Sequence, residues 1–463
     1  MQREMMKVMR ILGKLFIAGV VIFALLQLVR PGIPAKPASD TELEASPEVK
    51  QILEKGCYSC HSDQRRLSWF DEIVPAYWLV RNDILTAREH LNFSTLGAKP
   101  AAAQKATLYE AVNMVQLGAM PLPQFLKLHP EARLTPAELA TLKAYLAPWT
   151  TALPVANAQP APGPAAAPID QAAVQPELNG LAFDSSFENW KPLSTTDRGD
   201  NNTFRFILGN EVAVKAAQGG EVTPWPDGAR FAKIAWQQEL GADGLVHPGK
   251  FIQVELMVKN ARDHKATEGW GWGRWRGLDL KPYGKDAHFV NECTSCHQPL
   301  RGNDYVYTMP ISTATVGRDE VMNNAAVGLA AQLPYQPLGW NGITLYVDPR
   351  TRTTATLYGN DAAMAAVRTR GTGPAGGPMY PPGAVLALVT WAQREDPHWF
   401  GARIPDRPQM VEIVQVAGGG AQPVYQRFHG PAFTAERDPQ DDGAQSPVKR
   451  TSFMLGLAPV QLP

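Results

Sequence analysis

The pattern of hydrophobic and polar positions divides the 463-residue chain into an apolar N-terminal run, a helical region and a repeated region rich in predicted strands. Basic residues precede a mostly apolar run that begins at Ile11 and approaches the roughly 20 residues that a membrane helix needs. Counted from Leu15, the same run also fits the core of a cleavable signal. Arg30 and Pro31 follow it in place of a small-residue cleavage site, so residues 1–38 are predicted to be an uncleaved membrane anchor.

Residues 39–149 are predicted to form an all-α domain. Apolar residues recur at helical spacing over 75–91. A further helix is predicted over 134–146, where Thr135 is a candidate N-cap and Glu138, three residues later, completes a capping box.

Residues 150–178 are rich in proline and alanine without apolar periodicity, so they are predicted to be an extended linker. Beyond the linker, four landmarks occur twice in the same order. In the first copy they are Trp190-Lys-Pro-Leu193, Thr203 to Asn210, Trp225 to Trp236 and Val254-Glu255-Leu256, and in the second copy Tyr335-Gln-Pro-Leu338, Thr354 to Asn360, Tyr380 to Trp391 and Val411-Glu412-Ile413. We therefore predict two mainly β (α+β) domains, at 179–315 and 316–463. In each domain the Gly-Asn pair is predicted to end a strand and lead through a turn into a short helix.

The composition fits a protein with packed cores and turn-rich β structure. Hydrophobic residues make up 44% of the chain, which also holds 12 tryptophans, 40 prolines and 39 glycines. The formal net charge is zero and no run of Lys or Arg occurs beyond the N-terminus, so nothing indicates a nucleic-acid partner.

All four cysteines lie in two copies of one pentapeptide, Cys57-Tyr-Ser-Cys60-His61 and Cys293-Thr-Ser-Cys296-His297. Cys-x-x-Cys-His is the attachment signature of c-type haem, in which two thiols bond to the porphyrin and the histidine ligates the iron. A zinc site would have to join cysteine pairs more than two hundred residues apart, and a thioredoxin-like redox pair would explain neither the histidine nor the duplication. We therefore predict two covalently bound haem c groups, attached at Cys57, Cys60, Cys293 and Cys296 and ligated by His61 and His297.

Covalent attachment of this kind takes place outside the bacterial cytoplasm, which agrees with an exported protein. The basic flank of the apolar run is expected to stay in the cytoplasm. The body of the chain is therefore predicted to lie at the periplasmic face of the inner membrane, or free in the periplasm if the leader is cleaved.

A sixth ligand for the first haem iron is predicted at Met120. It lies in Gly118-Ala-Met120-Pro121-Leu-Pro, where the prolines present the side chain without helical backbone. Thioether ligation favours reduced iron and raises the potential, which suits electron transfer. A methionine packed in the core is the alternative, and His90 and His129 are rival ligands.

A series of motifs runs through the predicted helical domain. They are Cys57-Tyr-Ser-Cys-His-Ser62, Trp69, Pro75, Trp78, His90-Leu-Asn-Phe-Ser94, Gly118-Ala-Met-Pro-Leu-Pro-Gln-Phe125 and His129-Pro-Glu-Ala-Arg-Leu-Thr-Pro-Ala-Glu138. Together they resemble the pattern of a family of small haem-binding domains, except that Phe125 stands where the pattern more often has tyrosine. The resemblance implies a monohaem fold and says little about a substrate.

A second set of motifs surrounds the second pentapeptide. It comprises Asn202 to Asn210, Trp225-Pro-Asp-Gly228, Asp286 to His297 and Asp304-Tyr-Val-Tyr307. Over about residues 183–312 this set resembles the cytochrome P-460 family and its relative, cytochrome c′-β. The resemblance implies a mainly β haem pocket, often in a dimer, with His297 as proximal ligand and an open distal face. Members with a lysine covalently bonded to the haem oxidise hydroxylamine or nitric oxide, whereas cytochrome c′-β lacks that bond and binds small gases.

Lys233 is our candidate for such a covalent bond. Strand alternation places it on the face opposite Ile234 and Trp236, where an amine among small and aromatic neighbours has a lowered pKa and is more nucleophilic. The second copy has Leu388 at that position, so the fold itself does not require an amine. A lysine whose ammonium reaches solvent is the alternative. Other lysines of the domain also remain candidates: Lys215, Lys250 and Lys259.

Glu255 is a candidate distal base, because it could accept the protons that hydroxylamine loses together with its electrons. It alternates with the apolar positions of its predicted strand. Its counterpart in the copy without cysteines is Glu412, so a structural role for both carboxylates is the alternative.

Together these features predict a membrane-anchored dihaem cytochrome. The second haem would act on hydroxylamine or nitric oxide, and electrons would pass through the first haem to a partner cytochrome or a membrane electron carrier. One alternative is a gas-binding or peroxidase-like cytochrome, and another is an electron-relay subunit of a membrane complex without its own substrate. The family resemblance adds the expectation of a homodimer.

Overall fold

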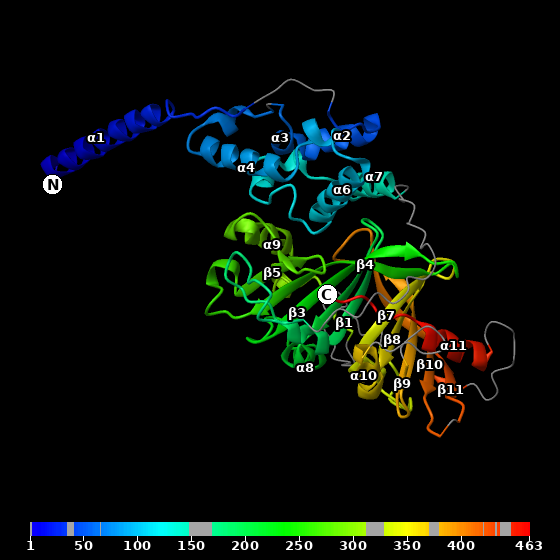
Figure 1. Cartoon of the computed structure of the whole chain (residues 1–463). Coiled ribbons are helices and arrows are strands. Elements are labelled where there is room, and N and C mark those ends of the chain that lie inside the picture. Colours follow the sequence, from blue (N-terminus) through cyan, green and yellow to red (C-terminus); the bar gives the residue numbers. More distant parts are fainter. Residues whose placement is uncertain are drawn as a thin grey trace. The chain divides into compact units, whose positions relative to one another are not determined.

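The computed structural model describes residues 2–34, 41–64, 66–147, 169–311, 328–369, 379–419, 421–430, 433–435 and 446–463. The chain divides into two compact units, 1–149 and 150–463. The first unit is helical and the second is built on a β-sheet (Figure 1). The predicted order, a helical domain followed by a β-rich region, is confirmed. Most of the predicted linker lies outside the described residues.

An apolar helix, α1 (Gln2–Leu26), begins the chain. Among the described residues, it is the one helix that is long and apolar enough to cross a membrane, so a membrane anchor and a signal sequence both fit it. The chain that leaves α1 is bonded to the helical unit. Gln27 exchanges two side-chain hydrogen bonds with the main chain of Val74, at 3.0 and 2.9 Å. The hydroxyl of Tyr77 donates to the carbonyl of Pro31 at 2.5 Å.

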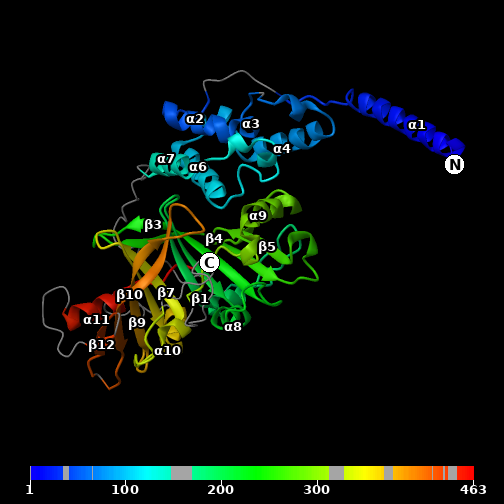
Figure 2. The ribbon, with the colours of Figure 1, turned by 180° about the vertical axis from the view of Figure 1, so that it is seen from behind.

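Helices and short 3-10 turns make up the rest of the first unit (Figures 1 and 2). The helices are α2 (Pro47–Gly56), α3 (Tyr58–His61), α4 (Ala76–His90), α5 (Phe93–Leu96), α6 (Ala101–Gln116) and α7 (Pro136–Leu146). The 3-10 turns are η1 (Trp69–Glu72), η2 (Phe125–Lys127) and η3 (Pro130–Ala132).

The helix ends follow from local sequence. At the start of α2, the Ser46 hydroxyl accepts a hydrogen bond from the main-chain N–H of Val49. At the start of α7, Thr135 Oγ1 accepts from the N–H of Glu138 at 3.2 Å, and Glu138 Oε2 accepts from the N–H of Thr135 at 2.7 Å. The predicted capping box is therefore confirmed, as are the two predicted helices in which α4 and α7 lie.

The second unit contains two sets of elements. The first set is η4 (Ser185–Asn189), β1 (Lys191–Arg198), β2 (Thr203–Gly209), α8 (Glu211–Gly219), β3 (Arg230–Leu240), β4 (Val246–Lys259), η5 (Lys265–Thr267), β5 (Trp270–Arg276), β6 (Lys281–Pro282), η6 (Ala287–Phe289), α9 (Val290–His297) and η7 (Gln298–Asn303). The second set is η9 (Pro337–Gly339), β7 (Asn341–Asp348), β8 (Thr353–Gly359), α10 (Asp361–Thr369), β9 (Val385–Glu395), β10 (Ala402–Gln415), β11 (Val424–His429), β12 (Thr434–Ala435) and α11 (Pro447–Gly456).

The second set repeats the first in the same order. β3 and β9 each have 11 residues, and β4 and β10 each have 14. The Gly-Asn pair has one role in both copies. Asn210 Oδ1 accepts hydrogen bonds from the N–H groups of Ala213, at 3.0 Å, and Arg230, at 3.1 Å. Asn360 accepts the equivalent pair of hydrogen bonds at 3.0 Å. In each copy the asparagine therefore caps the helix and fixes the turn between the strand and the helix.

The strands of the two copies join edge to edge and close into a barrel. Their order is β1-β2-β3-β4-β7-β8-β9-β10, and β1 also pairs with β10. One seam runs through Asp197 and Arg403, and the other through Val246 and Val347, both antiparallel. Each copy therefore pairs with the other at both ends of its set of strands.

The strands of the first copy have two different faces. One face carries a buried apolar core that includes Phe206, Ile234 and Trp236. The opposite face, here called the helix face, is covered by α8 and α9, which pack with Phe231 and Trp272. Strand alternation decides which face each side chain meets, as the sequence pattern predicts.

The last residues of the predicted linker pack onto the β unit instead of extending from it. The indole N–H of Trp275 donates to the carbonyl of Gln175 at 2.9 Å. The buried carboxylate of Glu177 accepts from the main-chain N–H of Arg274 at 2.8 Å. Residues 175 and 177 are therefore bonded to β5.

We expect Asn210→Ala and Asn360→Ala to lower the free energy of unfolding of the β unit by similar amounts, about 1–2 kcal/mol each, because each removes an oxygen that accepts two main-chain N–H groups. Urea unfolding followed by circular dichroism measures the change. Asn210→Asp keeps the accepting oxygen and should cost less. Wild-type stability in both alanine variants would contradict the capping role.

Candidate functional site

The first pentapeptide spans the end of α2 and the short helix α3. Cys57 and Cys60 are three residues apart, a spacing that places them on one side of a helical turn. His61 Nδ1 lies 2.9 Å from the carbonyl oxygen of Leu91. When Nδ1 donates this bond, Nε2 keeps its lone pair for a metal. Burial lowers the pKa of His61, which favours the neutral imidazole that metal binding requires.

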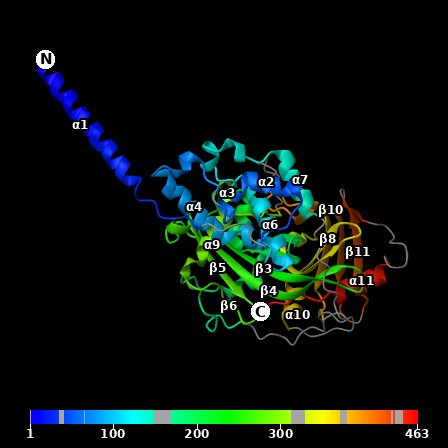
Figure 3. The same cartoon turned by 90° about the horizontal axis from the view of Figure 1, so that it is seen from above.

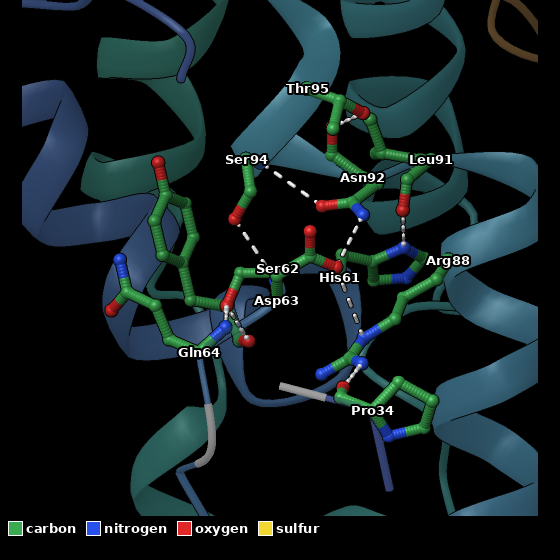
Figure 4. Close-up of polar contacts among 11 residues, drawn as sticks. Pro34, His61, Ser62, Asp63, Gln64, Arg88, Leu91, Asn92, Ser94 and Thr95 are labelled. Atoms are coloured by element: carbon green, nitrogen blue, oxygen red, sulfur yellow. Dashed lines mark hydrogen bonds and ion pairs between the residues drawn. The ribbon is translucent and has the colours of Figure 1, made fainter. Parts of the chain in front are cut away.

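The segment that supplies the Leu91 carbonyl is itself fixed by polar contacts around His61 (Figure 4). The Asn92 side-chain amide donates to Asp63 Oδ1 at 2.8 Å. Ser94 Oγ accepts from the main-chain N–H of Asp63 at 2.9 Å. These contacts give a physical role to the His-Leu-Asn-Phe-Ser motif: its residues tie the carbonyl that orients the histidine to the turn that follows the pentapeptide.

The predicted sixth ligand, Met120, has a half-buried side chain in the loop after α6. Its role as a ligand stays a prediction. The rival His129 is less suited to iron, because Nε2 lies 2.9 Å from Asp71 Oδ1 and Nδ1 lies 3.2 Å from Glu131 Oε1. Both of its nitrogens are therefore engaged by carboxylates, and the other rival, His90, is exposed at the end of α4.

The second pentapeptide lies in α9, beside β5 on the helix face (Figures 1 and 3). Cys293 and Cys296 are again three residues apart. His297 Nδ1 lies 2.6 Å from the carbonyl oxygen of Tyr305, so the same arrangement recurs. Burial lowers the pKa of His297 to about 3, which leaves a neutral imidazole at physiological pH. Its ring meets the edge of Trp272, with ring centres 4.6 Å apart.

A buried ion pair holds the Tyr305 carbonyl in place. Asp304 Oδ1 lies 2.8 Å from Lys259 Nζ, and its Oδ2 accepts from the N–H of Trp225 at 2.9 Å. The carbonyl of Asp304 accepts from the indole of Trp270 at 3.0 Å. Asp304 and Tyr305 have φ values of 46° and 66°, a conformation uncommon for side chains of this size. The bonds of Asp304 therefore stabilise the sharp turn that presents the carbonyl.

Lys233 and Glu255 face each other across β3 and β4, and Glu255 faces Arg274 across β4 and β5. Lys233 Nζ contacts Glu255 Oε2 directly, and Arg274 Nε lies 2.6 Å from Glu255 Oε1. Burial lowers the pKa of Lys233 well below its usual range, and the charges of Arg205 and Arg274 lower it further. The Glu255 carboxylate acts in the opposite direction, since it favours the ammonium. The amine and the carboxylate are therefore close enough for a proton to pass between them.

The other candidate lysines lie in different surroundings. Lys215 is exposed on α8 and pairs with Glu211, and Lys250 is exposed on β4. Lys259 is buried in its pair with Asp304. Lys233, in contrast, is close enough to His297 for its charge to lower the pKa of that imidazole.

Some buried polar groups near the second pentapeptide have no hydrogen-bond partner among the described residues. Among them are Nε of Arg205 and the indole N–H of Trp272. Burial lowers the pKa of Arg205 to about 9, so the guanidinium stays charged at neutral pH. A haem brings a flat apolar ring and two carboxylates, and guanidinium groups bind carboxylates well. The site therefore fits a haem. It offers two thiols, a neutral histidine with Nε2 available, and unpaired donors on the same face.

The donor sets in both units define the chain as a haem protein. The family model of the haem-binding domain matches residues 18–148, and that of cytochrome P460 matches residues 185–308. The chain therefore combines a haem-binding domain with a cytochrome P460 domain, as both sequence resemblances implied. The second match covers the first copy of the β unit. A search of curated proteins returned no match.

The groups that orient the two histidines were not predicted from the sequence. Both are main-chain carbonyls, of Leu91 and Tyr305, and a carbonyl leaves no trace in residue type. The available signal was indirect: each carbonyl lies inside a motif that the sequence analysis quoted for the family resemblance.

We expect Met120→Ala to open a coordination position on the first haem iron and to lower its midpoint potential, because thioether ligation favours reduced iron. Electron paramagnetic resonance and spectroelectrochemistry measure both changes. Met114→Ala, which removes another half-buried methionine, is the matched control and should leave the first haem unchanged. An unchanged first haem in Met120→Ala would show that another group is the sixth ligand.

Proposed function

We propose that the protein is an exported, membrane-anchored c-type cytochrome with two covalently bound haems. It oxidises hydroxylamine or nitric oxide at the haem of the P460 domain and passes the electrons to the haem of the helical domain. The observation that carries the proposal is the contact between Lys233 and Glu255 on the sheet face that also carries α9. This contact supports the proposal because the charge of Lys233 acts on His297, the candidate iron ligand.

Each residue of the second site would have a separate role. Cys293 and Cys296 would attach the haem, and His297 would ligate its iron through Nε2. The haem held by these residues would supply a redox-active iron that could accept electrons from a small nitrogen compound. Lys233 would supply the amine for the covalent bond to the haem edge. That C–N bond would replace an amine N–H bond and a ring C–H bond, so two protons and two electrons would leave, the electrons to an external oxidant of the peroxide class. Glu255 is in contact with the amine and can accept a proton from it.

The first site would serve as the electron relay. Cys57 and Cys60 would attach the haem, with His61 and Met120 as axial ligands. We propose a partner cytochrome or a membrane electron carrier as the acceptor. The helix α1 would hold the protein at the periplasmic face of the bacterial inner membrane, where both haem domains meet exported partners.

A gas-binding cytochrome is the second candidate function. It is favoured by the ion pair that Glu255 makes with Arg274, because a carboxylate that neutralises arginine has a structural role already. In that case Lys233 remains a free amine, and nitric oxide binds at the second haem without being oxidised.

Replacement of the candidate lysine tests the covalent bond. We expect the haem spectrum of the denatured wild-type protein to be red-shifted relative to plain c-type haem, and Lys233→Ala to abolish the shift. Lys233→Arg keeps the positive charge but should also abolish it. Lys215→Ala, at an exposed lysine, is the control and should retain it. A plain c-type spectrum in the denatured wild type would rule out the bond.

Addition of hydroxylamine to the oxidised protein tests the enzymatic proposal. We expect absorbance changes showing reduction of haem in the wild type, and at least tenfold slower reduction in Lys233→Ala, a loss of more than about 1.4 kcal/mol of transition-state stabilisation. Nitric oxide binding without reduction by either compound would favour the gas-binding alternative.

A further inference from the structure

The C-terminal helix α11 occupies the place in the second copy that α9 occupies in the first. Each follows the last short strand of its copy, and each packs beside the equivalent strand, β11 or β5 (Figures 1 and 3). Thr451-Ser452 of α11 correspond to Thr294-Ser295 of the second pentapeptide. Arg450, Phe453 and Met454 then stand where the first copy has Cys293, Cys296 and His297. The helix α11 is thus the counterpart of the haem-motif helix, without its thiols and imidazole.

Side chains of α11 close the helix face of the second copy. Met454 is fully buried against a cluster that includes Leu388, the counterpart of Lys233. Arg450 Nε donates to Glu412 Oε1 at 2.7 Å, and Glu412 is fully buried. The carboxylate that faces lysine in the first copy therefore pairs with arginine in the second. In the second copy, side chains of α11 thus occupy the position equivalent to the candidate haem site of the first copy.

The hairpin between β9 and β10 of this closed copy reaches the segment that follows α9. His398 Nδ1 lies 2.7 Å from the carbonyl oxygen of Tyr307, and His398 is buried. The ring of Trp399 meets the ring of Tyr307, with centres 5.5 Å apart. Two consecutive residues of the second copy therefore hold one residue of the first, by a hydrogen bond and by ring packing.

Tyr307 in turn contacts the pentapeptide at two points. Its ring meets the ring of His297 edge-on, with centres 4.9 Å apart. Its hydroxyl donates to the carbonyl of Cys296 at 2.7 Å. Tyr307 therefore touches both the candidate iron ligand and the residue that precedes it, which makes it the link between the hairpin and the ligand.

The hairpin is anchored to the first copy on its other side. The indole N–H of Trp399 donates to Asp200 Oδ2 at 3.3 Å, and the Arg198 guanidinium lies 4.1 Å from the centre of the Trp399 ring. Arg198 and Asp200 form a buried ion pair next to the β1–β10 seam. The ring of Trp399 is therefore held between this ion pair and Tyr307.

We propose that the second copy acts as a built-in partner subunit whose hairpin positions the iron ligand of the first. His398 and Trp399 are positioning residues: they hold Tyr307, and Tyr307 holds His297 and the Cys296 carbonyl. The proposal rests on His297 being the iron ligand, as in the proposed function, and is independent of the substrate.

The iron–histidine stretching band of the reduced second haem, measured by resonance Raman on the full-length protein, tests the proposal. We expect His398→Leu and Trp399→Ala to shift this band to lower frequency and broaden it, because the imidazole is no longer held in one orientation. His398→Asn can still donate to the Tyr307 carbonyl, and Trp399→Phe keeps the ring packing, so both should restore the wild-type band.

The equivalent strand pair of the first copy offers a matched control. His247 on β4 pairs with Asp243 at 2.9 Å and meets Tyr346 of the second copy, so His247→Leu should leave the band unchanged. Circular dichroism verifies that each variant is folded. An unchanged band in folded His398→Leu and Trp399→Ala overturns the positioning role alone. A band that survives His297→Ala overturns both this inference and the ligand assignment of the proposed function.

Discussion

Each candidate site depends on one hydrogen bond between a histidine Nδ1 and a main-chain carbonyl. His61 meets the carbonyl of Leu91, 30 positions along the chain, and His297 meets that of Tyr305, 8 positions along. This bond decides which ring nitrogen remains for a metal and in which direction it points. Much of the surrounding structure therefore serves to fix a carbonyl: Asn92 does so in the helical unit, and Asp304 in the β unit.

Comparison of the two copies distinguishes residues that both copies share from residues that only the first copy has. Glu255 and Glu412 both pair with arginine, so a carboxylate at this position is part of the fold in both copies. The amine of Lys233 has no such counterpart, because Leu388 takes its place and packs against α11. Lys233 sits beside two arginines in a partly buried site, an arrangement unfavourable to an ammonium. The contact with the Glu255 carboxylate offsets this effect, so the amine, unlike the carboxylate, is particular to the first copy.

Local sequence patterns predicted strand faces and helix starts, whereas contacts between distant segments could not be predicted from them. Strand alternation placed Lys233 on the face opposite Ile234, and the Thr135 capping box marked the start of α7. The direct contact of Lys233 with Glu255 depends on the register between two strands, which alternation within one strand does not determine. The packing of the last linker residues depends on buried Glu177 and the Gln175 carbonyl, and no apolar pattern marks it in the sequence.

Closure of the barrel gives the second copy a role that does not depend on haem. A lone first copy would expose strand edges at β1 and at the end of β4, and exposed edges recruit other chains. In this chain β10 pairs with β1, and β7 pairs with β4. The two copies therefore cover each other's strand edges. Because β10 pairs with β1 where the barrel closes, the hairpin that joins β9 and β10 is held beside the first copy, where it contacts Tyr307. The second copy can therefore lose its own site to α11 and still determine the geometry of the first.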